Sequence, residues 1–221
     1  MRKDLLVDGS YYHVINRSIA QYEIFKEIDD YMRFLQILDL YRYKDFNYKY
    51  SNFSELTTAN QQAIIQALKK NSLKLVEIVA YCIMPTHFHL ILEQISDKGI
   101  SKFMAKVLNS YSRYFNLRHK RKGPLWESHF QNILINSDEQ LLHLTRYIHL
   151  NPVSAGLVEK PEDWAFSSYS EYLKDEEDNL CEYEDLLDIS SENYKKFVNN
   201  RISYQKELSK IKRILLENYV S

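Results

Sequence analysis

Two histidines separated by one residue are the clearest candidate metal ligands in the chain. They occur as His87-Phe88-His89 in the segment HFHLILE. Successive side chains of a β-strand point to opposite faces, so His87 and His89 would share a face and could chelate one ion. Isolated pairs of this kind more often serve as ordinary sheet residues. The pair therefore predicts a metal site only together with other residues.

A tyrosine and an asparagine four residues apart form the second candidate group, in the segment YIHLNP. This spacing would place Tyr147 and Asn151 on one face of a helix, one turn apart. A phenol can attack phosphorus, and an amide oxygen suits a hard cation; a mixed histidine and oxygen site accommodates Mn²⁺ and tolerates Mg²⁺. The alternative is structural, with Tyr147 in the core and Asn151 ending the helix before Pro152. Taken alone, these residues favour that alternative.

Strands and helices that could position these groups follow from the residue patterns. Aromatic and β-branched runs predict strands, and apolar residues at helical spacing predict helices. The predicted strands are 11–17, 73–84, 87–93 and 130–136, and the predicted helices are 22–41, 59–70, 99–118, 137–152 and 193–219. The strands 73–84 and 87–93, joined by a bend, are expected to pair antiparallel. Ser137, with Gln140 three residues later, is the expected N-cap of the helix that carries Tyr147.

Charge is distributed unevenly along a chain whose formal net charge is only −1. Residues 101–124 contain no acidic residue, whereas acidic residues are concentrated after Leu157. Within the basic segment, the charges predicted to contact a DNA backbone are Lys102, Lys106, Arg113, Arg118, Lys120, Arg121 and Lys122. Lys102, Lys106, Arg113 and Lys120 would project within about 40° of one another if the helix continued through them. For 120–122, an ordinary solvated loop is an equally good interpretation.

Composition limits the class of protein. The 221 residues are 45% hydrophobic and 27% charged, which is typical of a globular chain and not of a disordered one. The two cysteines, Cys82 and Cys181, lack the number and spacing of a disulfide framework, and no apolar run approaches the length of a membrane span. We therefore expect a cytoplasmic protein.

The order of these motifs resembles a known family. The histidine pair, a basic helix, the segment GPLWE and then YIHLNPV are together similar to the HUH single-tyrosine transposases, in particular the REP-associated tyrosine transposases. The resemblance covers roughly residues 11–172. It implies an α+β fold, with a ferredoxin-like antiparallel sheet and helices on one face. Two departures are a polar, partly helical insertion at 44–72 and an acidic, helical extension at 173–221, so that residues 1–172 would form the transposase domain.

The resemblance also implies a role for each candidate residue. His87, His89 and Asn151 would bind Mg²⁺ or Mn²⁺, and Tyr147 would attack a phosphate of single-stranded, hairpin-forming DNA to give a 5′-phosphotyrosine intermediate. Tyr111 and Tyr114 are competing nucleophiles, although the spacing of Tyr111 on its helix favours the core. Relatives include both dimers and monomers, so a homodimer stays one alternative.

Two other functions remain open at this stage. One is a nucleic-acid-binding relative without catalysis, and the other is a phosphodiester hydrolase in which metal-bound water attacks DNA. The remaining histidines are expected to be surface or structural residues, namely His13, His119, His129, His143 and His149.

Overall fold

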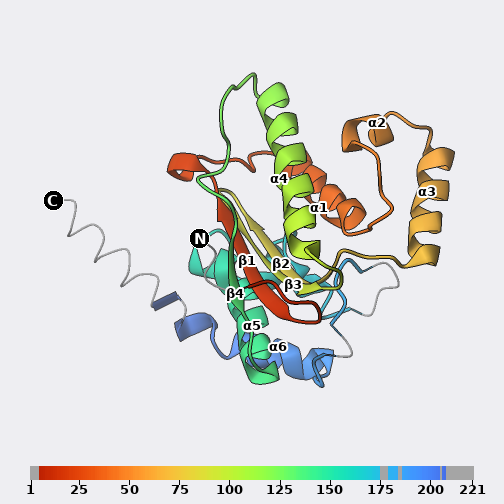
Figure 1. Ribbon diagram of the computed structural model, residues 1–221. Coiled ribbons are helices and arrows are strands. Elements are labelled where there is room, and N and C mark those ends of the chain that lie inside the picture. Colours follow the sequence, from red (N-terminus) through yellow and green to blue (C-terminus); the bar gives the residue numbers. More distant parts are fainter. Residues whose placement is uncertain (1–4, 175–178, 184–185, 205, 208–221) are drawn as a thin grey trace. The chain divides into compact units, whose positions relative to one another are not determined.

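The computed structural model describes residues 5–174, 179–183, 186–204 and 206–207 (Figure 1). The chain divides into two compact units. The first consists of Met1–Ile78 and Pro85–Ile135, and the second of Val79–Met84 and Asn136–Ser221. The expected boundary between a domain at 1–172 and an extension at 173–221 stays a prediction, and most of the acidic residues of that extension lie outside the described residues.

A four-stranded sheet carries the histidine pair. Its order is β2–β3–β1–β4, with β1 at Tyr11–Arg17, β2 at Val76–Met84, β3 at His87–Gln94 and β4 at Gln131–Leu134. β1 pairs antiparallel with both β3 and β4. All four predicted strands are thus confirmed, β1 with its exact bounds.

Two long helices of the first unit, α1 (Ile28–Tyr41) and α4 (Gly99–Arg118), lie side by side (Figure 1). Aromatic side chains connect them to the sheet. The ring of Phe34 on α1 lies 5.0 Å from that of Phe88 on β3 and 5.2 Å from that of Tyr111 on α4. Because Phe88 points away from its histidine neighbours, this packing leaves His87 and His89 on the opposite face of the sheet. The expected fold, an antiparallel sheet with helices on one face, is confirmed.

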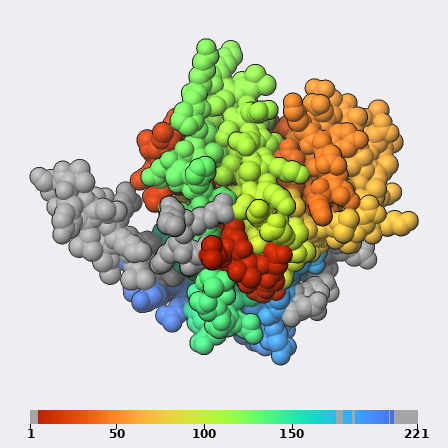
Figure 2. Space-filling view, viewed as in Figure 1, coloured from red at the N-terminus to blue at the C-terminus, as the bar shows by residue number. Residues whose placement is uncertain are grey.

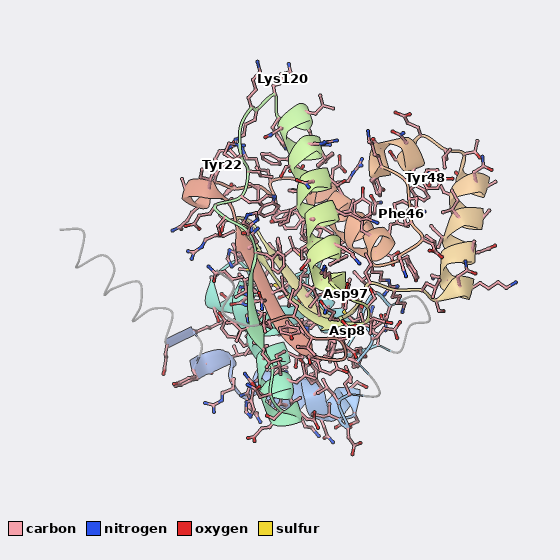
Figure 3. The ribbon with its side chains drawn as sticks, in the orientation of Figure 1. Asp8, Tyr22, Phe46, Tyr48, Asp97 and Lys120 are labelled. Carbon is pink, nitrogen blue, oxygen red and sulfur yellow. The ribbon has the colours of Figure 1, made fainter. Side chains whose placement is uncertain are left out.

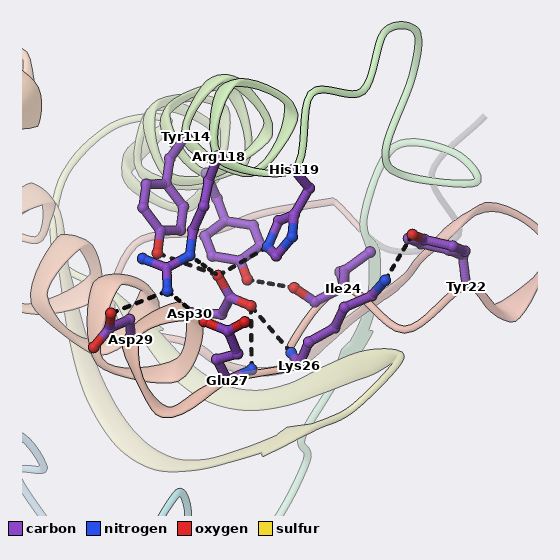
Figure 4. Close-up of polar contacts among 10 residues, drawn as sticks. Tyr22, Ile24, Lys26, Glu27, Asp29, Asp30, Tyr114, Arg118 and His119 are labelled. Atoms are coloured by element: carbon purple, nitrogen blue, oxygen red, sulfur yellow. Dashed lines mark hydrogen bonds and ion pairs between the residues drawn. The ribbon is translucent and has the colours of Figure 1, made fainter.

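The predicted helix at 22–41 is wrong over its first turns, since α1 begins only at Ile28. The backbone N–H groups of Ile24 and Phe25 both donate to the carbonyl of Pro85, which fixes this segment against the bend before β3. Glu27 is the N-cap, and Asp30 accepts hydrogen bonds from the N–H groups of Lys26 and Glu27 (Figure 4). Tertiary hydrogen bonds therefore override the helical spacing of the apolar residues.

The predicted insertion contains two helices, α2 (Tyr50–Ser54) and α3 (Thr58–Asn71). The sequence predicts α3 but not the five-residue α2. Thr57 caps α3 by accepting a hydrogen bond from the N–H of Asn60, and Ser72 ends it in a left-handed conformation. That turn delays β2 to Val76, three residues after the predicted start of the strand.

Gly99, the first residue of α4, permits a close approach of two backbones. A Cβ at this position would lie 2.0 Å from the carbonyl oxygen of Leu75, a distance that only backbone movement could relieve. The start of the basic helix is thereby held against the start of β2.

In the second unit, α5 (Asp138–Ser154) carries Tyr147 and Asn151. The Ser137 hydroxyl accepts a hydrogen bond from the N–H of Gln140, which confirms the predicted N-cap. The helix extends two residues beyond its predicted end, with Pro152 in its last turn. The predicted terminal helix at 193–219 corresponds to α6 (Ser191–Asn199) and further helical residues at 202–204, while its end lies outside the described residues.

Within the second unit, the segment 164–172 runs along residues 79–84 of β2. The N–H of Ile83 donates to the carbonyl of Phe166, and the Tyr172 hydroxyl donates to the carbonyl of Val79. Among the described residues, no helix is both long and apolar enough to cross a membrane.

Candidate metal and tyrosine site

The strand register gathers three histidines on one face of the sheet. Ile15 lies opposite His89, and His13 lies opposite Ile91. Residues that face each other in an antiparallel pair project to the same side, so His13 shares a face with His87 and His89. The ring centroids of His87 and His89 are 5.1 Å apart, and those of His13 and His89 are 5.2 Å apart.

Both predicted ligands are held through the same ring nitrogen. His87 Nδ1 lies 3.0 Å from the Thr86 hydroxyl, and His89 Nδ1 lies 3.0 Å from His13 Nε2. A histidine that donates a hydrogen bond from Nδ1 keeps a fixed ring orientation and leaves Nε2 available to a metal. The two hydrogen bonds therefore supply the outer support that metal-binding imidazoles usually have.

Burial keeps these imidazoles neutral. It lowers the pKa of His13 to about 4. The pKa of His89 is lowered well below its usual value by burial and by the neighbouring His13 and His87. The pKa of His87 is lowered by burial and by the positive charge of Arg17. Neutral imidazole is the form that binds metal, so the protonation state of these residues suits a divalent cation near pH 7. Among the described residues no group of three or more His, Cys, Asp or Glu side chains is placed to hold one, so a further ligand of another kind would be required.

His13 contacts a candidate ligand. It was expected to be a surface or structural residue, and the structural alternative holds, because it is 6% exposed and lies within hydrogen-bond distance of His89. Its contact with His89 was not predicted from the sequence. The two histidines are 76 positions apart, so only the pairing of β1 with β3 brings them together. The one available signal was that His13 and Arg17 have the spacing of residues on the same face of a strand.

Arg17 lies directly opposite His87 in the sheet. Its Nε forms an ion pair with Glu127 Oε2 at 2.8 Å, and the N–H of Glu127 donates to the Arg17 carbonyl. Both side chains are about half exposed. The segment GPLWE is therefore anchored to the end of β1 that lies beside His87.

Tyr147 and Asn151 lie one turn apart on α5, as their spacing predicts. The Tyr147 side chain is 44% exposed, and partial burial raises its pKa. The phenol is therefore protonated at neutral pH and must lose its proton to act as a nucleophile.

Asn151 lies near the end of α5, and its side-chain amide has a buried nitrogen, Nδ2, without a hydrogen-bond partner among the described residues. Gly156 adopts a positive φ of 72°, and the N–H of Leu157 then donates to the carbonyl of Pro152, which closes the helix. An orphaned buried N–H donor costs stability and would be satisfied by an acceptor such as a phosphate oxygen, whereas a cation would bind the amide oxygen.

The competing tyrosines have other partners. Tyr111 is fully buried, and its hydroxyl donates to the carbonyl of Ile24. Tyr114 donates to Asp30, and burial beside that carboxylate raises its pKa to about 12. The expectation that Tyr111 is a core residue is confirmed, and neither phenol is poised to ionise.

His149, in contrast, is a core residue whose two ring nitrogens both have partners. Nδ1 lies 2.7 Å from the Tyr194 hydroxyl and Nε2 lies 2.8 Å from the Ser168 hydroxyl. The structural role expected for His149 is confirmed.

The predicted DNA-binding cations are in different environments. Lys102 donates to the carbonyl of Asp97, and Lys106 donates to the carbonyl of Phe46 from a partly buried position. Arg118 pairs with Glu27 and Asp29 on α1 and its N-cap, so this cation helps to join two elements (Figure 4).

Three further predicted cations lie beyond α4, which ends at Arg118. Lys120 has a positive φ of 49° in the loop after the helix, so the helical phase assumed for it is wrong (Figure 3). Arg121 donates to the carbonyls of Gly123 and Pro124 and thereby braces this loop. Lys122 is exposed. A contact of any of these residues with DNA stays a prediction.

The sequence of this chain matches a known family. Residues 44–151 match the family model described as "Transposase IS200 like", and this range includes His87, His89, Tyr147 and Asn151. The resemblance to the single-tyrosine transposases is confirmed. The matched range of this transposase-like chain begins at residue 44 and therefore includes the predicted insertion.

Two curated relatives carry the name REP-associated tyrosine transposase. The protein of Haemophilus influenzae is 31% identical over 110 residues, which cover 45% of this chain and 62% of the relative. The Escherichia coli K12 protein is 27% identical over 119 residues, covering 52% of this chain and 68% of the relative. The transposase-like chain thus spans less than two thirds of the length of the Haemophilus protein.

A solved structure shares the fold. It is described as a REP-associated tyrosine transposase bound to a REP hairpin, and it is 18% identical to this chain. The alignment has a TM-score of 0.50 and covers 86% of this chain and 95% of the other. This likeness shows that the chain shares the fold of that structure.

Proposed function

We propose that this chain is a metal-dependent DNA strand transferase that cleaves single-stranded DNA through Tyr147. The observation that carries the proposal is the pair of neutral imidazoles, His87 and His89, held through Nδ1 on one face of the sheet. Neutral imidazole is the form that binds metal, and this supports the proposal. The names of the relatives support DNA ends with hairpins as the substrate class.

In this proposal His87, His89 and the amide oxygen of Asn151 hold Mg²⁺ or Mn²⁺. When bound, the cation supplies Lewis acidity, which stabilises the negative charge that develops on the phosphate oxygens. Thr86 and His13 keep the two imidazoles oriented. Arg17, half exposed beside His87, supplies a positive charge near the phosphate.

The transfer step forms one bond and breaks one. The oxygen of Tyr147 attacks phosphorus, its proton passes to water, and a phosphotyrosine bond forms. The bond between phosphorus and the 3′ oxygen breaks, and that oxygen takes a proton from water to leave as a 3′-hydroxyl. Attack by another 3′-hydroxyl reverses these changes and joins a new DNA strand, with no oxidant or high-energy cofactor consumed.

A decisive test uses 5′- and 3′-labelled hairpin DNA taken from sequence flanking the gene, with Mg²⁺ or Mn²⁺. We expect a denaturant-resistant protein–DNA adduct that disappears in Tyr147→Phe and in His87→Ala. Tyr114→Phe is the matched control and should retain the adduct, because the Tyr114 hydroxyl donates a hydrogen bond to Asp30 and is not the proposed nucleophile.

The two rival functions give different results in the same assay. Cleavage without an adduct, undiminished in Tyr147→Phe, would indicate hydrolysis by metal-bound water. Tight hairpin binding without cleavage would indicate a catalytically silent DNA-binding relative. Either outcome would reject Tyr147 as the nucleophile.

A further inference from the structure

A cavity in the first unit lies away from the histidine pair. Its volume is about 570 Å³, and its walls come from residues 46–55 together with α1 and α4. Phe46 and Tyr48 occupy the space between α4 and the two helices α2 and α3 (Figure 3). The space-filling view shows this segment beside α4 on one face of the molecule (Figure 2). A volume of this size is typical of sites for small ligands.

The lining of the cavity is strongly basic. Four cationic side chains contribute to it, against the single carboxylate of Glu55; the cations are Arg33, Lys49, Lys106 and Arg113. Such an excess, in a concave site with aromatic walls, attracts a ligand that carries negative charge.

Arg33 lines the cavity and lies against two aromatic rings. Its guanidinium lies 4.1 Å from the ring centre of Tyr50 and 4.7 Å from that of Tyr114. Across the described residues, no carboxylate forms an ion pair with Arg33. Because the two rings leave its N–H groups without a charged partner, the guanidinium can donate to phosphate oxygens.

An anion in the cavity would also stabilise the charged form of Lys106. Its Nζ has one hydrogen bond, a long one of 3.4 Å to the carbonyl of Phe46, and burial lowers its pKa. A phosphate oxygen nearby would compensate the desolvated ammonium group.

Exposed apolar surface lies next to these cations. Tyr48 is 45% exposed, and its ring centre is 5.8 Å from that of Phe46. Leu117, another lining residue, is 83% exposed. Cations beside an exposed ring are the combination that binds single-stranded nucleic acid, with bases stacked and phosphates paired.

We propose that this cavity binds an unpaired nucleotide of single-stranded DNA, with the base stacked on Tyr48 and the phosphate held by Arg33 and Lys106. The inference rests on DNA being the partner in the proposed function, but not on cleavage by Tyr147. An acidic peptide would pair with the cations and leave the aromatic wall unused, so a nucleotide accounts for more of the site.

The test is an anisotropy titration of the full chain with fluorescein-labelled dT12, which forms no hairpin, in EDTA to prevent cleavage. Tyr48→Ala should weaken binding by about 5- to 100-fold through lost stacking. Lys106→Gln and Arg33→Gln should each reduce the slope of log affinity against log salt by about 0.7. Lys70→Gln is the matched control, since it removes an exposed charge of α3 that does not line the cavity, and it should change affinity less than twofold.

Glu55→Gln separates binding from misfolding, because removing the one carboxylate should strengthen binding, which a damaged fold cannot do. The proposal is overturned if dT12 does not bind, if Tyr48→Ala and Lys70→Gln have equal effects, or if poly-aspartate of equal charge competes as well as unlabelled dT12. Tyr147→Phe should bind dT12 normally. An absent adduct with intact dT12 binding would therefore reject the cleavage chemistry and retain the cavity.

Discussion

His87 on β3 and His149 on α5 are both kept neutral by burial, yet their environments differ. Both ring nitrogens of His149 have hydroxyl partners, and the residue is fully buried. His87 is only partly buried and is held at Nδ1 by Thr86, while its Nε2 has no partner within the described part of the chain. A lowered pKa alone therefore does not distinguish a ligand from a core residue. The number of occupied ring nitrogens does.

Replacing His87 should have the largest effect of these substitutions. That effect should be on activity and not on stability. His87→Ala removes a metal ligand, so metal-dependent cleavage should fall by about 1000-fold, which corresponds to several kcal/mol of transition-state stabilisation. Because the side chain is partly exposed, the free energy of unfolding should change by less than about 1 kcal/mol. Adduct yield and urea unfolding measure the two quantities. A large loss of stability would show that His87 is structural, as His149 is.

The same substitution at His149 should affect stability instead. His149→Ala leaves a cavity and removes a partner from the buried Tyr194 and Ser168 hydroxyls, at a cost of about 3 kcal/mol. Urea unfolding followed by circular dichroism gives this number. His143→Ala, on the exposed side of α5, is the matched control and should cost less than about 0.5 kcal/mol. Equal effects at the two positions would contradict the assignment.

The lowered pKa of His149 predicts that the protein loses stability in acid. Burial lowers its pKa to about 3, whereas the unfolded chain has a value of about 6.5. Below pH 6.5 the unfolded state therefore binds a proton that the native state does not, and stability falls as pH falls toward 3. At pH 5 this one group should cost about 2 kcal/mol.

Unfolding free energies measured between pH 5 and 7.5 in His149→Gln test this sign. The amide can replace hydrogen bonds but cannot titrate, so the slope against pH should decrease by close to one proton. An unchanged slope would mean that other groups, such as His13, dominate the acid response.

His13 should affect metal binding less than a direct ligand does. His13→Leu removes the hydrogen bond to His89 Nδ1, and loss of such outer support typically weakens metal affinity by about 10- to 100-fold. Mn²⁺ titration followed by electron paramagnetic resonance measures affinity without DNA. His129→Gln, an exposed histidine of the same unit, is the control. Unchanged affinity in His13→Leu would show that His89 is oriented by other contacts.

The sequence predicted elements well where local patterns decide them. β1 and α4 have their predicted bounds because strand residues alternate and apolar residues recur along the helix. Prediction failed where distant groups decide. Residues 22–27 form no helix because Ile24 and Phe25 bond to Pro85, although the later N-cap at Glu27 could have been recognised from Asp30 three residues on.

The candidate site shows the same division between local and distant information. The shared faces of His87 with His89, and of Tyr147 with Asn151, follow from spacing within one strand and one helix. The contact of His13 with His89 depends on which residues of β1 and β3 face each other, and a single sequence does not contain that register.

Replacing Thr86 should have the smallest effect on metal affinity. It is also the most direct test of how His87 is oriented. Thr86→Val keeps the shape of the side chain and removes the hydroxyl that lies 3.0 Å from His87 Nδ1. A neutral hydrogen bond contributes about 1 kcal/mol, so Mn²⁺ affinity should fall by about fivefold. Thr86→Ser restores the hydroxyl and should recover most of the affinity. If valine and serine behave alike, the orientation of His87 comes from the sheet and from Arg17, and the hydroxyl is incidental.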